Sequence, residues 1–332
     1  MNPLRTIKLS VKVAQNVYFK HFPFLLYLKP TARCDCRCKT CNRWQNSNLS
    51  KEEIDINAVK KLLEKFSQAG FTVFTLWGGE PLLRKDAPEI LQYAKNSGFR
   101  TSMCTNCNLL SKRAEEVIPL VDVLLCSFDG YAKTHDELRG VRGLFERAVR
   151  GIEEAKKVNP DCDIKIWASI HKKNIGEIEK IVILSSYLKI GIEFFPISPI
   201  SGYNNELIPS NEEILEAFET IIHLKKQGFP IRNSFHSLKI MRNNSPFVCN
   251  FPLISVHINH LGEIYCCEDP AGNPVYKWGK YPHFNPFEIF NSIEFKKVSG
   301  GLRKCNSCKL PCIVELSGNI SYALYNSFLK TK

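Results

Sequence analysis

Short apolar segments alternate with helical segments along the first part of this 332-residue chain, and this alternation constrains the fold more than any other feature. Apolar runs predict six strands, at residues 25–28, 72–77, 100–105, 122–127, 163–170 and 191–196. Helical periodicity predicts intervening helices near residues 57–69, 87–97, 114–118, 144–157 and 175–188. Alternating β/α units form a parallel sheet with crossover helices, and six units are too few for the common eightfold barrel.

The carboxyl ends of these strands carry most of the residues with chemical potential. In parallel α/β barrels such ends gather at one rim, where active sites are found. Four segments fall there, at residues 34–41, 78–81, 105–106 and 127–129. The topology therefore predicts that they converge on one site.

The first of these segments contains Cys34, Cys38 and Cys41 in a C-x3-C-x2-C arrangement. Three thiolates can hold three corners of a cubic iron–sulfur cluster, which leaves the fourth iron open to a small ligand. A zinc site is the alternative, although zinc sites usually show C-x2-C pairs and a fourth ligand at matching spacing. Cys36 lies inside the loop, at the wrong spacing for a fourth ligand.

The second segment is a glycine-rich turn, Gly78-Gly79-Glu80-Pro81, directly after the second predicted strand. The two glycines allow the backbone to approach a bound ligand closely. Glu80 adds a carboxylate that can bind an ammonium group. Taken alone, this turn is equally compatible with an ordinary strand-to-helix connection.

Together these motifs resemble the radical S-adenosylmethionine (SAM) enzymes. The resemblance rests on the cysteine triad, on the GGEP turn and on the S-x-D-G segment of Ser127 and Asp129, and it extends over roughly residues 22–312. It implies an open six-strand partial barrel, (β/α)6 of the TIM type, and a [4Fe-4S] cluster on the triad. The methionyl amine and carboxylate of SAM would chelate the open iron. The remaining SAM contacts that it implies are Gly78, Gly79, Glu80, Pro81, Asn106, Ser127 and Asp129.

Six further cysteines occur in the last third of the chain. Residues 253–258 and 263–267 predict an antiparallel hairpin, and Cys305 and Cys308 form a C-x2-C pair. Adjacent strand residues point to opposite faces, so only one of the neighbours Cys266 and Cys267 is expected to be a ligand. His257 and His260 flank the turn and are expected at the surface. Four thiolates from a hairpin and a loop also suit zinc.

This C-terminal arrangement resembles the twitch and SPASM extensions of radical SAM enzymes, and the cysteine number fits the one-cluster twitch form. The resemblance implies a second, auxiliary [4Fe-4S] cluster. Its implied ligands are Cys249, Cys267, Cys305 and Cys308, with Cys266 and Cys312 as substitutes.

Three regions are expected along the chain: a basic amphipathic helix over residues 1–21, the core over 22–235 and the auxiliary-cluster domain over 236–332. The 14 cysteines, without an apparent secretory leader, favour a reducing cytoplasm. The N-terminal helix is expected to dock on its own domain or to lie peripherally on the inner membrane surface. The net charge of +12 is consistent with a lysine-rich surface, and no nucleic-acid-binding module is visible.

The predicted function is reductive cleavage of SAM to a 5′-deoxyadenosyl radical, which abstracts hydrogen from a substrate. The resemblance implies a reductase, ferredoxin or flavodoxin as electron donor. It leaves two substrate classes open: peptides or proteins, and lipids or other small molecules. The alternative is a non-catalytic iron–sulfur or zinc protein that carries electrons or binds a partner.

Overall fold

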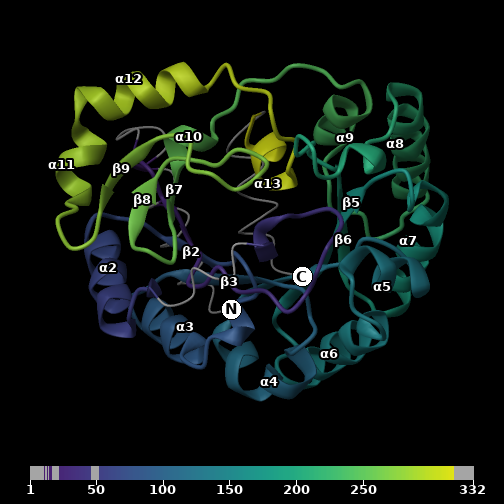
Figure 1. Cartoon of the computed structure of the whole chain (residues 1–332), viewed down its shortest axis with the longest axis horizontal. Helices are drawn as coiled ribbons and strands as arrows, with labels where there is room; N and C mark the ends of the chain where they lie inside the picture. The colour runs from purple at the N-terminus through teal and green to yellow at the C-terminus, as the bar shows by residue number, and fades with distance from the viewer. Residues whose placement is uncertain (1–10, 12, 14, 17–21, 46–51, 318–332) are drawn as a thin grey trace.

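The computed structural model describes residues 11, 13, 15–16, 22–45 and 52–317, which form one continuous sheet with helices packed around it (Figure 1). The strand order within the described residues is β6-β5-β4-β3-β2-β1-β7-β8-β9. The strands are β1 (Leu25–Leu28), β2 (Val73–Leu76), β3 (Arg100–Thr105), β4 (Val123–Ser127), β5 (Asp163–Ile170), β6 (Gly191–Pro196), β7 (Ser255–Ile258), β8 (Glu263–Tyr265) and β9 (Lys277–Lys280). The first six pair in parallel in sequence order, which confirms the partial (β/α)6 barrel.

Helices cover the outside of the six parallel strands, as the arc from α2 to α8 in Figure 1 shows. These helices are α2 (Ile56–Gln68), α3 (Ala87–Asn96), α4 (Leu110–Val117), α5 (Lys133–Arg139), α6 (Leu144–Val158), α7 (Ile178–Tyr187) and α8 (Asn211–Lys226). Local signals account for their starts. Ser210 caps α8 and forms a reciprocal capping box with Glu213, and the Asp55 carboxylate accepts from two amides at the start of α2.

The two faces of the sheet differ in chemistry. Side chains alternate between faces along a strand, so the register assigns each residue to one side. The outer face is apolar and packs against the helices through residues such as Leu26, Phe74 and Ile166, all at most 1% exposed.

The inner face carries a row of mainly polar and aromatic side chains, here called the inner row. It comprises Tyr27, Lys29, Thr75, Trp77, Ser102, Cys104, Leu125, Ser127, Lys165, Trp167, Ser169, Glu193, Phe195, His257 and Tyr265. Several of its members in mid-sheet, among them Tyr27, Cys104 and Trp167, are only partly buried, whereas their outward neighbours are fully buried. The inner face is therefore not closed by its own packing.

The amino-terminal ends of the first strands are covered by the C-terminal part of the chain. Leu25 and Val73 form a second core cluster with residues that include Phe251 and Ile313. Val13 belongs to the same cluster. Most of the predicted N-terminal helix lies outside the described residues, so membrane contact through it stays a prediction. Among the described residues no helix is long and apolar enough to cross a membrane.

The C-terminal part begins with α9 (Phe235–Arg242) and α10 (Phe251–Ile254) and ends with α11 (Pro286–Asn291), α12 (Ile293–Leu302) and α13 (Pro311–Val314). The predicted hairpin forms as β7 and β8, with β9 added as a third antiparallel strand. Because β7 also pairs in parallel with β1, the sheet continues across the predicted boundary near residue 235. The division into domains at that point stays a prediction.

One expectation for this hairpin is wrong. His257 is only 3% exposed and is not a surface residue. It pairs with Tyr27 of β1 across the sheet, and the two rings stack with centroids 4.8 Å apart. The sequence pattern predicted a surface position because it does not reveal the parallel pairing of β7 with β1. That pairing joins segments far apart in the chain.

Candidate functional site

The cysteine triad lies in the loop that leaves β1 at its carboxyl end. The end of α5 holds this loop: the Arg37 amide donates to the Arg139 carbonyl (2.9 Å), and the Lys39 amide donates to that of Leu138 (2.7 Å). From beyond β6, the Tyr203 hydroxyl donates to the carbonyls of Cys38 (2.5 Å) and Cys41 (3.2 Å). Contacts from two distant elements thus fix the backbone between the three thiols.

The donor set of the loop suits an iron–sulfur cluster. A hydrogen bond from Cys36 and the charge of Arg139 lower the pKa of the Cys38 thiol to about 7, although burial opposes this. A large fraction of this thiol is therefore in the metal-binding thiolate form near neutral pH. Within the described residues no three His, Cys, Asp or Glu side chains are gathered tightly enough for one metal ion. A cubic cluster does not require that, because each thiolate binds a different iron.

Cys36 belongs to the packing of the loop. Its side chain is fully buried and forms a small apolar cluster with Cys38 and Leu144. Hydrogen bonds to Cys34 and Cys38 raise the pKa of the Cys36 thiol and keep it protonated. Its exclusion from the ligand set, which rests on spacing, stays a prediction.

The two glycines of the GGEP turn allow it to lie against the triad loop. A Cβ on Gly79 would stand 2.0 Å from the Arg33 carbonyl oxygen, and one on Gly78, which has φ +125°, would meet Lys29 at 2.8 Å. The Glu80 amide donates to the same Arg33 carbonyl at 2.8 Å. The close approach that the glycines permit is therefore, in the first place, between the two loops.

Glu80 is a buried acceptor that ties this turn to the end of β3. Its carboxylate accepts from the Leu82 amide (3.0 Å), the Thr105 hydroxyl (2.9 Å) and the Asn106 amide (2.8 Å), and it has no exposed surface. Burial raises the pKa of Glu80 to about 7 despite these donors. Because the protein's own donors occupy the carboxylate, its contact with an ammonium group stays a prediction.

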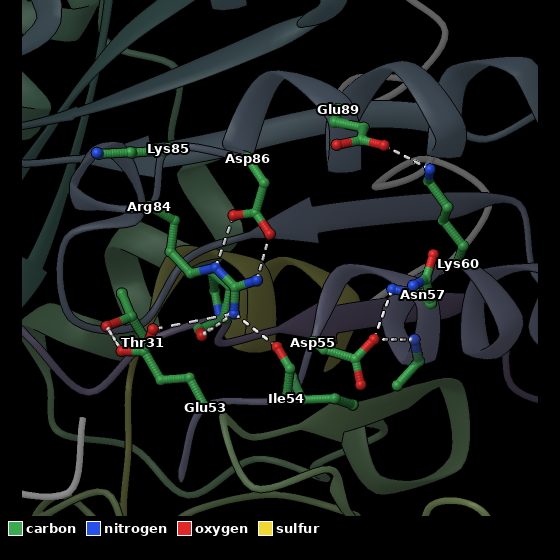
Figure 2. Close-up of polar contacts among 12 residues, drawn as sticks. Thr31, Glu53, Ile54, Asp55, Asn57, Lys60, Arg84, Lys85, Asp86 and Glu89 are labelled. Atoms are coloured by element: carbon green, nitrogen blue, oxygen red, sulfur yellow. Dashed lines mark hydrogen bonds and ion pairs between the residues drawn. The ribbon is translucent and has the colours of Figure 1, made fainter. Parts of the chain in front are cut away.

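Figure 2 shows the polar network that supports both loops from outside. The Arg84 guanidinium donates to the carbonyls of Pro30 (3.0 Å) and Ile54 (2.8 Å) and pairs with Asp86. Glu53 accepts from the Thr31 hydroxyl in the same view. Arg84 thus joins the segment after β2 to the first residues after β1, and nothing in the motifs indicated this role.

Asn106 and Asp129 also meet the triad loop. The Asn106 amide group donates to Asp35 (2.7 Å) and reaches the Cys34 sulfur (3.9 Å). Asp129 is buried and pairs with Arg139 (Oδ2 to Nη2, 2.8 Å), and Arg139 contacts the Cys38 sulfur through Nη1 at 3.8 Å. Although burial raises it, the charges of Arg139 and His171 and a hydrogen bond from Ser169 hold the pKa of Asp129 below its usual value.

Ser127 lies at the end of β4 on the inner row, with its hydroxyl 3.9 Å from the Cys104 sulfur. The four predicted segments thus converge at the carboxyl ends of β1 to β4. Their individual contacts with SAM stay predictions.

The C-terminal cysteines also converge. Burial and then the neighbouring thiols Cys249 and Cys305 raise the pKa of Cys308 to about 12. Cys249 and Cys308 likewise contribute to the raised pKa of Cys267, after its hydrogen bond to Cys266 and burial. None of the 14 cysteines forms a disulfide.

The prediction that strand alternation selects one of Cys266 and Cys267 is wrong in its premise. The strand ends at Tyr265, before the adjacent cysteines. The sulfurs of Cys266 and Cys267 lie 3.7 Å apart, so strand alternation does not decide between them.

A buried charged group that sequence reasoning missed connects the two cysteine regions. Glu268, next to Cys267, pairs with Lys29 at the end of β1 and with Arg43 of the triad loop (2.7 Å). No sequence signal marks it, because its members come together only through the pairing of β7 and β8 with the barrel.

A partial barrel with three clustered thiols beside a glycine-rich turn defines a class of iron–sulfur enzymes. The model of the Radical SAM superfamily matches residues 28–184, so this part of the chain is a Radical SAM domain.

Curated relatives resemble the chain in sequence, and a solved structure resembles it in fold. The chain is 32% identical to the AdoMet-dependent heme synthase of Methanosarcina barkeri over 67% of this chain and 65% of that protein. It is 27% identical to the Fe-coproporphyrin III synthase of the same organism, over 60% and 52%. The chain therefore spans somewhat less than two thirds of these relatives. The fold resembles that of Streptococcus suis SuiB bound to S-adenosylmethionine, with a TM-score of 0.67 and 17% identity over 87% of this chain and 71% of that one.

Proposed function

We propose that the chain binds a [4Fe-4S] cluster through Cys34, Cys38 and Cys41 and uses it to cleave SAM reductively. When bound, the cluster supplies one electron to the sulfonium, so that methionine and a 5′-deoxyadenosyl radical form and the radical takes a hydrogen atom from the substrate. The electron comes from a reductase, ferredoxin or flavodoxin. The observation that carries the proposal is the backbone contact of the GGEP turn with the triad loop, through Arg33.

The chain's own residues supply position and enclosure. The loop contacts from α5 and Tyr203 hold the three thiols, and Glu80 holds the GGEP turn against β3. Fixed geometry of this kind contributes to catalysis by reducing the entropy that the reacting groups must lose. The inner row begins beside these loops and extends across the barrel, so we place the substrate against it.

We further propose an auxiliary [4Fe-4S] cluster on Cys249, Cys267, Cys305 and Cys308. The mutual proximity of these thiols supports it: Cys249 and Cys305 contribute to the raised pKa of Cys308, and Cys249 and Cys308 contribute to that of Cys267. Anaerobic reconstitution should therefore load about twice the iron of a single cluster. A variant with Cys34, Cys38 and Cys41 changed to alanine should keep roughly half of that iron.

For the substrate we favour a planar tetrapyrrole over a peptide. Two relatives are named for haem and for Fe-coproporphyrin III. The inner row offers the partly exposed flat rings of Tyr27, Trp77 and Trp167, on which an extended π system can stack. Tighter binding of a precursor peptide than of coproporphyrin III would favour the peptide class.

The test of the central claim is product formation. Anaerobically reconstituted protein with dithionite and SAM should release 5′-deoxyadenosine, and the triple alanine variant of the triad should release none. Full iron content without this product would leave only the non-catalytic alternative, an electron carrier or a binding scaffold.

A further inference from the structure

Two cations share one carboxylate between the triad loop and the auxiliary region. The Lys29 ammonium and the Arg43 guanidinium both pair with Glu268. Their side chains are 10%, 23% and 5% exposed, respectively, so all three groups are largely removed from water. The group thus holds two basic side chains against one carboxylate, and a buried uncompensated charge is costly. Burial and the charge of Arg43 accordingly lower the pKa of Lys29.

Two neutral polar groups beside this cluster have no hydrogen-bond partner among the described residues. Both ring nitrogens of His257 and the indole nitrogen of Trp77 are buried and unpaired. The rings of His257 and Trp77 are 5.8 Å apart at their centroids. Lys29 and Arg43 each lie 5.0 Å from the centre of the Trp77 ring. Buried polar groups in native proteins are nearly always satisfied, so these nitrogens are free to bind a polar group from outside the chain.

The location is on the inner row, against which we place the substrate. Lys29, Trp77 and His257 belong to the inner row, and Arg43 follows Cys41 by two residues. Glu268 stands next to Cys267. A ligand here would lie beside the partly exposed ring of Tyr27, on which His257 and then Tyr265 stack.

We propose that Lys29, Arg43 and His257 form an anion subsite that binds a carboxylate of an aromatic substrate, with Trp77 as a further donor. Arginine and lysine supply charge and several donors, and a guanidinium can hold a carboxylate through two parallel bonds. An imidazole with one N–H and an indole N–H complete the donor set. The inference rests on the proposed function for its place in catalysis, but the subsite can be tested without the reaction.

The test uses 1-naphthoate and its neutral counterpart 1-naphthylmethanol, titrated separately into the reconstituted full-length protein and followed by saturation-transfer NMR. Wild type should bind the carboxylate on the order of tenfold more tightly, as expected for one charge-assisted interaction. Lys29→Met should remove this preference, and His257→Phe, which keeps a ring for stacking, should reduce it several-fold. Lys60→Met is the matched control, since Lys60 pairs with Glu89 at the surface.

Equal affinities of the two probes for wild type, or an unchanged preference in both variants, would overturn the subsite. A matching loss of SAM affinity in the variants would also overturn it, because the group would then serve the cofactor. Iron content and circular dichroism establish that each variant is folded, and His257→Phe remains informative if Lys29→Met is not. Release of 5′-deoxyadenosine by wild type tests the proposed function separately.

Discussion

At the scale of single residues, Glu80 shows how a motif residue can act through the protein's own backbone. Its carboxylate accepts three hydrogen bonds and links the turn after β2 to the end of β3. We expect Glu80→Gln to lower the free energy of unfolding by about 1–3 kcal/mol, because the glutamine NH2 group must face one of three donors. Chemical denaturation measures the change. Glu89→Gln, at an exposed ion pair, should cost far less, and equal costs would contradict the argument.

His135 provides a prediction for pH. Burial lowers the pKa of His135 to about 3, and Nδ1 accepts a hydrogen bond from the Asp129 amide at 3.2 Å. A histidine with a lowered folded-state pKa stabilises the protein fully above its unfolded value of about 6.5, and this contribution is lost as the pH falls toward 3. The loss amounts to at most ~5 kcal/mol.

The matching variant is His135→Asn, whose side-chain oxygen can accept the same hydrogen bond without titrating. Denaturant unfolding at pH 7 and pH 4 should show a smaller decrease for this variant than for wild type. His223→Asn, at an exposed position on α8, should keep the wild-type decrease. An identical pH dependence in all three proteins would show that His135 is not the titrating group.

The site residues that the sequence revealed lie next to one another in short motifs. The triad and GGEP carry their spacing in consecutive residues, so local chemistry suffices to find them. Lys29, Glu268 and His257 carry no such signal, since each is an ordinary residue until strand pairing brings them together. Glu80 is intermediate: its presence was evident, but its partners in β3 were not.

At the scale of elements, the contact between the loops after β1 and β2 depends on one glycine. A Cβ at position 79 would meet backbone atoms of Arg33, which cannot move aside as a flexible side chain would. We expect Gly79→Ala to destabilise the protein by about 1–3 kcal/mol, as overpacking does, and to impair cluster loading. Thermal unfolding and iron analysis test this. Gly176→Ala, with open space at the new methyl group, is the control, and a similar loss there would refute the explanation.

The parallel strands and most of their helices were predictable because apolar periodicity reports burial directly. Four of the six strands have the predicted bounds, and the other two are shorter by one residue at one or both ends. Helix α5 was missed, since it is short, polar and begins at Lys133 directly after a residue with positive φ. Strand β9 was missed because only its Trp278 is buried and its ladder with β8 carries a register shift.

At the scale of the whole molecule, the six-stranded barrel and the C-terminal part of the chain share one sheet and one main hydrophobic core. The main cluster runs from Phe22 to Val314, and the second cluster joins Leu25 and Val73 to C-terminal residues. We therefore expect the full chain to unfold in one cooperative transition when denaturant is added. Circular dichroism measures this transition. A fragment of residues 22–235 should be much less stable, because β1 loses its pairing with β7 and the amino-terminal ends of the first strands become exposed. A fragment with the stability of the full chain would show that the regions fold independently.

The difference between the two faces of the strands bears on how such a protein diverges. Outer-face residues pack against the helices, whereas inner-row residues line the side of the sheet on which we place the substrate. A substitution at an inner position such as Trp167 would change the surface offered to a bound substrate. A substitution at its neighbour Ile166 would disturb the packing of the sheet against the helices. Proteins that descend from one ancestral chain can therefore change their substrate through substitutions at inner-face positions. The outer-face positions, and with them the fold, can stay the same.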